Sequence, residues 1–317
     1  MSQFERATLK YWVALFMVLS FQGLLQADPI RLSFLNDTTA LEQTLTFLRK
    51  TGCENDSIAA FDKAIKQYYS TPPIIDFRKF PEQKDGYYSF TNMPQLLAAV
   101  PPGLCKIPHP FEFNCFDAAI VLANDHLRSN LNPEADLGTF LPTIIAENGM
   151  MVYTHARTAK EAFNLCYPSW YQNASSNCIP PSVANARMNL TAAFYCFHRL
   201  PAPTNQESLD KEVLQTLCTS WNNQKISFPS NFEIVLCHQV DLANNLIATD
   251  HAGLLFQTKN GFVYIEKDGG RGPFIRLDFG DKADLIAWLA WPYAEANGEI
   301  VYATFNNDKI EKLYPKL

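Results

Sequence analysis

The side chains best suited to chemistry are a cysteine and an asparagine at the start of a predicted helix, Cys115 and Asn114. Asn114 is a suitable N-cap, which places Cys115 Sγ in the first helical turn. There, the unpaired backbone N–H groups and the positive end of the helix dipole favour a thiolate over a thiol. The same N–H groups, together with Asn114, could hold an oxyanion that forms beside the sulfur. This chemistry is attack on a carbonyl, and it needs a base, normally a histidine that a third polar group orients.

His251 is the candidate base, because it begins a run of strand-forming residues. Asn260-Gly261 predicts a hairpin turn to the next strand. In both registers that we considered, with a two-residue or a four-residue loop, His251 shares a sheet face with Glu266 and Asp268. Glu266 is the candidate third member, because it interrupts an apolar run. Asp268 is the alternative: it lies closer to the position opposite His251, but it also begins a glycine-rich turn.

Each of these residues also has a plain structural interpretation. Cys115 could be a core residue or half of a disulfide, and His251 could be a hydrogen-bonded structural histidine. Glu266 could be a charge that protects an edge strand, and Asp250 a turn residue. Two other function classes therefore stay open. One is a non-catalytic envelope binding protein with the same fold, in which Cys115 is disulfide-bonded or buried. The other is a glycan-binding module that uses four aromatic residues, Trp170, Tyr171, Trp288 and Trp291.

Several familiar catalytic motifs are missing from the chain: Gly-x-Ser-x-Gly, the Walker A loop, His-Glu-x-x-His and Cys-x-x-Cys. The six histidines include no pair at ligand spacing, so we expect neither a metal nor a cofactor. Cys237-His238 lies in a predicted strand, where neighbours face opposite ways, so we expect one in the core and the other at the surface. The glycine-rich segment 268–272 predicts a turn, because no helix follows it.

The composition excludes several classes of protein. The chain has 317 residues, of which 47% are hydrophobic and 13% aromatic, with 26 basic and 32 acidic side chains. A disordered chain, a collagen-like fibre or a coiled coil would need a compositional bias that is missing here. The net charge of −6 argues against binding of nucleic acid through bulk charge.

The N-terminus predicts export. Arg6 and Lys10 form a basic segment, an apolar run follows over 11–21, and Leu25-Gln26-Ala27 is a suitable cleavage site. We expect residues 1–27 to be a signal peptide and the mature chain to be periplasmic or secreted, with no stable membrane span. An uncleaved N-terminal anchor is the alternative. All eight cysteines follow the cleavage site, and in an oxidising compartment we expect several to be paired, with Cys166 and Cys178 as the first choice.

The apolar periodicity predicts an α+β fold in a single mature domain, 28–317, with a helical N-terminal extension over 28–100. Residues 70–86 read as a loop. Predicted helices cover 38–51, 55–69, 93–100, 115–127, 158–166, 182–198, 207–221 and 281–291, and predicted strands cover 232–240, 246–256, 262–266 and 299–305.

The order of cysteine, histidine and acidic residue resembles that of the papain-like superfamily, including its NlpC-type cell-wall amidases. Asn114-Cys115, His251-Ala-Gly253 and Glu266-Lys267 are more closely similar to the marks of an uncharacterised family of exported bacterial proteins, itself distantly similar to that superfamily. The resemblance covers roughly residues 111–289. It implies N-terminal helices packed on a C-terminal antiparallel sheet, with Cys115 as nucleophile, His251 as base and Glu266 as the orienting residue.

The chain departs from the better-known branches of this superfamily. The papain motif Cys-Gly-Ser-Cys-Trp is absent, and Asn114-Cys115-Phe116-Asp117 stands where NlpC amidases have an Asp-Cys-Ser-Gly type of motif. Transglutaminases share the Cys-His-Asp order, but no aromatic residue follows His251 closely. The resemblance therefore implies a thiol hydrolase that acts on a peptide or other amide, and the predicted compartment points to cell-wall peptide as the substrate.

Overall fold

The structure is a computed structural model that describes residues 29–71, 77–100, 113–124, 126–129, 131–138, 140–141, 143–145, 151–166, 184–201, 206–269, 272–293 and 300–314. The predicted signal peptide, Cys178, Trp170 and Tyr171 lie outside these residues. Across the described ranges, no helix is long and apolar enough to cross a membrane.

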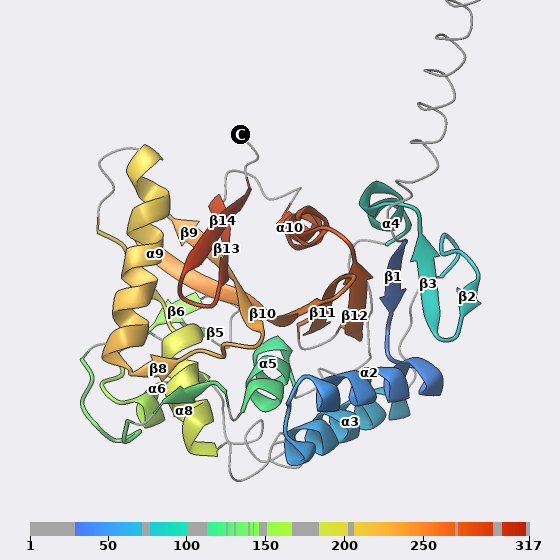
Figure 1. Cartoon of the computed structure of the whole chain (residues 1–317). Helices are drawn as coiled ribbons and strands as arrows, with labels where there is room; N and C mark the ends of the chain where they lie inside the picture. The colour runs from blue at the N-terminus through green and yellow to red at the C-terminus, as the bar shows by residue number, and fades with distance from the viewer. Residues whose placement is uncertain are drawn as a thin grey trace, which may run out of the picture.

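A ten-stranded antiparallel sheet forms the centre of the described fold (Figure 1). Its strand order is β14-β13-β9-β10-β11-β12-β1-β3-β2, and β7 pairs with part of β10. The strands are β1 (Ile30–Ser33), β2 (Gln83–Lys84), β3 (Tyr87–Phe90), β7 (His198–Arg199), β9 (Glu233–Asp241), β10 (Leu246–Thr258), β11 (Gly261–Lys267), β12 (Phe274–Phe279), β13 (Ile300–Phe305) and β14 (Lys309–Tyr314). Two small pairs stand apart, β4 (Arg128–Ser129) with β8 (Ile226–Ser227) and β5 (Thr143–Ile145) with β6 (Met151–Tyr153).

Helices cover both faces of the curved sheet (Figure 1). On one face, α2, α3, α5 and α9 share a core with the sheet, and on the other α4 and α10 do so. A smaller apolar cluster lies between α6 and α8. The helices are α2 (Thr38–Lys50), α3 (Asn55–Ser70), α4 (Met93–Ala99), α5 (Cys115–Ala123), α6 (Ala159–Cys166), α8 (Ala184–Phe194), α9 (Gln206–Asn223) and α10 (Lys282–Ala290), which continues as the 3₁₀ turn η2 (Trp291–Tyr293).

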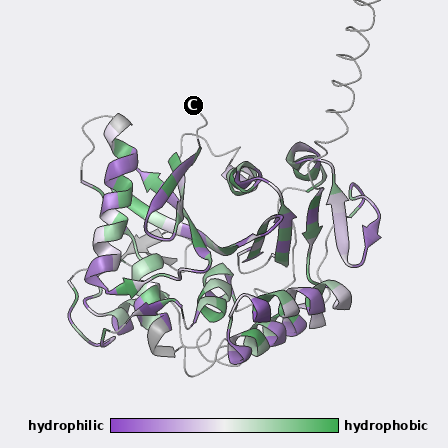
Figure 2. Cartoon of the chain, viewed as in Figure 1, coloured by the Kyte–Doolittle hydropathy of each residue, from purple (hydrophilic) through white to green (hydrophobic). Residues whose placement is uncertain are grey.

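The helix α5 differs from the surface helices in being buried on every side. All of its residues are buried, whereas α2 buries one stripe and exposes the rest. Figure 2 shows the same contrast, with α5 hydrophobic along its length and α2 and α3 partly hydrophilic. A helix held on all sides has little freedom to shift, so its first residue is fixed in place.

The mixed α+β class is confirmed, with N-terminal helices and a large antiparallel sheet in the C-terminal half. The N-terminal segment 28–100, predicted as a helical extension, contains the helices α2, α3 and α4 and also three strands that were not predicted, β1, β2 and β3, which extend the sheet. β12 and β14 were also not predicted. In β12 the buried Arg276 interrupts the apolar alternation, and it is accommodated by Asp278, whose Oδ1 accepts from Arg276 Nε at 2.7 Å. The predicted helix 115–127 ends earlier, at Ala123.

The expectation that one of Cys237 and His238 faces solvent is wrong, because both are buried on opposite faces of β9. The His238 ring is accommodated by two threonine hydroxyls. Its Nδ1 lies 3.0 Å from Thr249 Oγ1, and its Nε2 lies 2.8 Å from Thr304 Oγ1. A buried histidine with both ring nitrogens bonded needs no solvent, and hydropathy along the strand does not reveal such partners.

Acid is expected to destabilise the fold through two buried histidines. Burial lowers the pKa of His238 to about 3 and that of His198 to about 4. In the unfolded chain both rings titrate at pH ~6.5. The contribution of the two neutral rings to the free energy of unfolding is therefore complete above that pH, and it is lost as the pH falls through the folded-state pKa values. We expect urea unfolding to show a loss of about 1 kcal/mol per histidine for each pH unit below ~6. A His238→Gln variant should lose stability less steeply, and equal slopes for both proteins would contradict this assignment.

Candidate active site

The start of α5 is fixed by a reciprocal pair of hydrogen bonds. Asn114 Oδ1 accepts from the backbone N–H of Asp117 at 3.0 Å, and Asp117 Oδ2 accepts from the N–H of Asn114 at 3.2 Å. This capping box confirms Asn114 as the N-cap and makes Cys115 the first helical residue. Cys115 is a free thiol and is 3% exposed.

A buried ion pair holds this cap from a second helix. Arg187 Nη2 of α8 lies 2.8 Å from Asp117 Oδ1, and the two side chains are 5% and 0% exposed. Buried charges need such a partner, since neither can be solvated by water. The same Asp117 therefore serves the N-cap with one oxygen and Arg187 with the other. Arg187 was not predicted, because nothing local in the sequence marks it as the partner of Asp117.

A β-bulge turns His251 toward the site. The register between β9 and β10 shifts between Thr249 and His251, so Asp250 is an extra residue, not the turn residue considered above. Residues two apart on a regular strand face the same way. Here Thr249 instead bonds His238, whereas His251 points to Glu266 on the other face. Bulges commonly redirect side chains in this way beside functional sites.

Glu266 is the residue that orients His251. Its Oε2 lies 2.6 Å from His251 Nε2, and its Oε1 accepts from Trp288 Nε1 at 2.9 Å. The hairpin has the four-residue register, with Gly253 opposite Glu266, and the predicted shared face of His251 and Glu266 is confirmed. Trp288 belongs to α10 and is 5% exposed. From the sequence, Trp288 was predicted only as one of the four aromatic residues of a glycan-binding module.

The start of α5 meets His251 just beyond the last β10–β11 pair, so that the three predicted residues come together. Burial by itself lowers the pKa of His251. The Glu266 carboxylate and a hydrogen bond with Cys115 outweigh burial, and the pKa of His251 stands well above its ordinary value. Because Nε2 is bonded to Glu266, Nδ1 is the nitrogen left to face the sulfur. The arrangement is a thiol, an imidazole and a carboxylate in series, which can generate a thiolate and deliver a proton.

Asp268, the alternative third member, has a different environment. Its backbone closes the glycine-rich turn: its N–H donates to the Pro273 carbonyl at 2.9 Å, and its carbonyl accepts from Gly272 at 2.7 Å. Burial and the nearby Glu266 charge raise the pKa of the Asp268 carboxyl. The buried Lys267 ammonium donates to the carbonyls of Gly269 and Gly272. The described part of this segment is thus a turn held by backbone hydrogen bonds and by the Lys267 ammonium. The carboxylate that is hydrogen-bonded to His251 is that of Glu266.

Gly253 makes room for a tyrosine beside the site. A Cβ at Gly253 would lie 2.2 Å from Tyr264 Oη and 2.4 Å from its Cζ. Tyr264 is fully buried, and burial followed by the Glu266 charge raises the pKa of its phenol well above the ordinary value. The phenol therefore stays protonated next to the carboxylate that orients His251.

Gly253→Ala is expected to disturb the site more than its size suggests, because Tyr264 cannot remain in place. Overpacking of this kind costs about 1–3 kcal/mol, which urea unfolding would measure. We also expect slower alkylation of Cys115, since the displaced ring presses on Glu266. Gly280→Ala is the control, because a Cβ there meets nothing within 4 Å. Equal stability of the two variants would show that the contact between Gly253 and Tyr264 is unimportant.

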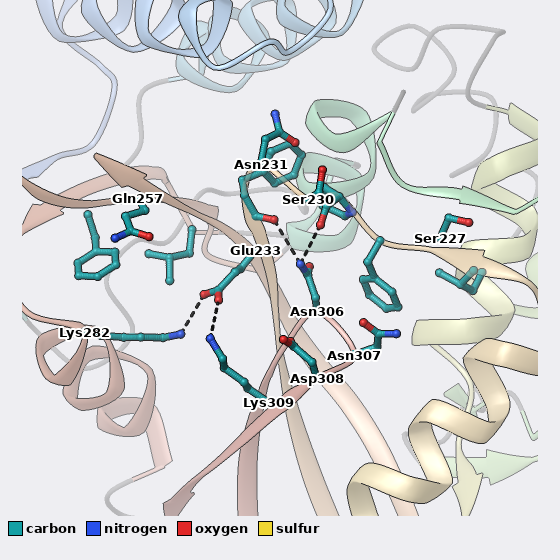
Figure 3. Close-up of a pocket in the computed structure, with 16 residues that line it drawn as sticks. Ser227, Ser230, Asn231, Glu233, Gln257, Lys282, Asn306, Asn307, Asp308 and Lys309 are labelled. Atoms are coloured by element: carbon teal, nitrogen blue, oxygen red, sulfur yellow. Dashed lines mark hydrogen bonds and ion pairs between the residues drawn. The ribbon is translucent and has the colours of Figure 1, made fainter. Parts of the chain in front are cut away.

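A polar groove of about 700 Å³ lies at the C-terminal end of β10, where Leu255 and Gln257 line it (Figure 3). Glu233 forms ion pairs across it with Lys282 at 2.9 Å and Lys309 at 3.6 Å. Asn306, which lines the groove, donates from Nδ2 to the carbonyls of Pro229 and Phe232 and so links the two segments that form its wall. None of the three predicted catalytic residues lines this groove, so it is separate from the site at Cys115.

Among the described residues, no group of three or more His, Cys, Asp or Glu side chains is placed to hold a metal ion. Of the predicted disulfide pair, Cys166 is a free thiol in this structure and Cys178 lies outside the described residues.

Comparison with known proteins gives one match. Residues 191–310 match the family described as Domain of unknown function (DUF4300). This segment includes β9 to β13 with His251 and Glu266, whereas Cys115 lies before it. The comparisons with curated proteins and with solved structures found no match.

Proposed function

We propose that this protein is an exported thiol hydrolase with a papain-like arrangement, which cleaves an amide bond. The observation that carries the proposal is the series of contacts from Cys115 through His251 to Glu266. Each group has the position that its role requires: the sulfur begins a helix, the imidazole links sulfur and carboxylate, and the carboxylate is itself fixed by Trp288.

In the proposed reaction, the Cys115 thiolate attacks the amide carbonyl and forms a tetrahedral intermediate. The His251 imidazolium then protonates the leaving amine, and the resulting neutral imidazole activates a water that hydrolyses the thioester. Glu266 stabilises the imidazolium and keeps Nδ1 directed at the sulfur. The raised pKa of His251 supports this role, because it keeps the proton on the ring at neutral pH.

The oxyanion would lie at the N-terminus of α5. Backbone N–H groups of the first turn point toward it, and the helix dipole favours negative charge there. Asn114 Oδ1 accepts from the Asp117 N–H, and the side-chain Nδ2 of Asn114 is the group that would donate to the oxyanion. By compartment and by resemblance, the substrate class we propose is peptide of the bacterial envelope.

The test is alkylation of the folded, unreduced protein with iodoacetamide at about pH 6, where an ordinary thiol is mostly protonated. Peptide mapping should find rapid labelling of Cys115. Glu266→Gln should slow this labelling about tenfold, because loss of the carboxylate lowers the pKa of His251 and with it the population of the thiolate–imidazolium pair. Asp268→Asn should stay close to wild type, since Glu266 is the partner of His251.

Cys53 provides an internal control in the same digest. It is also a free thiol and is 6% exposed, and burial raises its pKa. It should remain unlabelled under conditions that label Cys115. Equal labelling of the two cysteines would contradict the proposed activation of Cys115.

A non-catalytic binding protein is the second candidate, and the low exposure of Cys115 favours it. In that case the thiol is a core group, and His251 with Glu266 is a structural pair. No labelling of Cys115 at about pH 6, combined with full labelling after unfolding, would support this candidate over a hydrolase.

A further inference from the structure

Two further cysteines of the described residues, Cys166 and Cys196, lie together away from the His251–Glu266 pair, as hydrogen-bonded free thiols. Cys166 is the last residue of α6, and Cys196 follows the end of α8. Both belong to the apolar cluster between these two helices, with Cys196 1% exposed and Cys166 partly exposed at its edge. We propose that Cys166 and Cys196 form a disulfide bond in the exported protein, in place of the pair Cys166–Cys178.

The chemistry of the two thiols suits stepwise oxidation. A hydrogen bond with Cys166, followed by burial, raises the pKa of the Cys196 thiol. Cys166 is the more accessible of the two sulfurs, so it is the one that an external disulfide can reach first. Cys196 lies in the same apolar cluster and is hydrogen-bonded to Cys166, so it is placed to attack second.

The reaction balances as thiol–disulfide exchange with a disulfide donor, either an oxidoreductase of the exported compartment or a small disulfide such as glutathione disulfide. The Cys166 thiolate attacks the donor, and one donor thiol leaves. Cys196 then attacks Cys166 Sγ and releases the second donor thiol. The protein loses two hydrogen atoms, and the two electrons reduce the donor disulfide to two thiols.

The bond would brace the helix that supports the nucleophile. α8 carries Arg187, which holds Asp117 at the start of α5. The residue before Cys196, Tyr195, places its ring 5.0 Å from that of Phe116 in α5. A disulfide between the ends of α6 and α8 would therefore stabilise two contacts with α5, the Arg187–Asp117 ion pair and the Tyr195–Phe116 ring contact. This holds whatever reaction α5 supports.

The experiment uses the full chain exported with its own leader and purified without reductant. Free thiols are blocked with iodoacetamide, and the digest is mapped without reduction. We expect a linked peptide containing Cys166 and Cys196, and reductant should lower the melting temperature by several degrees. Cys166→Ser should abolish both the link and the effect of reductant, whereas Cys53→Ser, which removes a buried thiol elsewhere, should retain both.

A link between Cys166 and Cys178, or alkylation of both Cys166 and Cys196, would overturn the proposal. These readouts need no substrate, so they are independent of whether Cys115 is catalytic. If Cys166→Ser does not fold, the linked peptide of the wild-type chain still decides the outcome.

Discussion

Cys115→Ala is expected to reduce hydrolysis of an amide substrate by about 10⁴-fold or more while leaving the fold intact. The nucleophile is the one group whose role no neighbour can take over, and loss of a triad nucleophile in comparable enzymes has effects of at least this size. The structural cost should be small, because only one buried sulfur is removed and the capping box between Asn114 and Asp117 does not involve it. We expect a loss of about 1–2 kcal/mol in unfolding free energy.

Cys53→Ala is the matched control for this prediction. It also removes a buried free thiol, but one that lies against Thr51, outside the site. It should lose comparable stability and keep full activity. The measurement is turnover of envelope peptides, or of any amide that the wild-type protein is first shown to cleave. Normal turnover by Cys115→Ala on such a substrate would remove the assignment of Cys115 as nucleophile.

The parts of the site that could be predicted depend on short-range rules. Asn114 before an apolar helical run predicts a cap, and a cap fixes where the next side chain lies. The hairpin between β10 and β11 links His251 to Glu266, because strand parity decides which residues share a face once the turn is known. Both features are set by residues within a few positions, or within one hairpin, of each other.

The other parts depend on contacts between distant segments. Trp288 reaches Glu266 from a helix that follows the whole hairpin, and Arg187 reaches Asp117 from another helix. The bulge at Asp250 inverts the strand alternation that residue types alone would predict. β1 was missed because a strand of only four residues, next to the predicted leader, shows too little periodicity to detect.

The largest expected loss of stability comes from Arg187→Met. The methionine fills similar space but leaves the Asp117 carboxylate buried without its partner, and breaking a buried ion pair from one side costs about 3–5 kcal/mol. The Arg187 guanidinium also lies 5.2 Å from the centre of the Phe163 ring, so the substitution removes a cation–π contact as well. Urea unfolding of the purified variant measures the loss.

Arg157→Met is the control, since it removes an arginine from an ion pair of similar length at the surface. Arg157 Nη2 lies 2.6 Å from Asp136 Oδ2, with side chains that are 74% and 53% exposed, and pairs of this kind contribute about 0–1 kcal/mol. Adding Asp117→Asn to Arg187→Met should recover part of the loss, because a neutral amide can still accept from the Asn114 N–H. Equal stability of the two single variants would contradict the view that Arg187 supports the start of α5. A large loss without recovery in the double variant would instead assign the effect to packing around Phe163. Recovery would show that the loss comes from the unpaired charge of Asp117 at the start of α5, which Arg187 of the sequence-distant helix α8 balances in the wild-type protein.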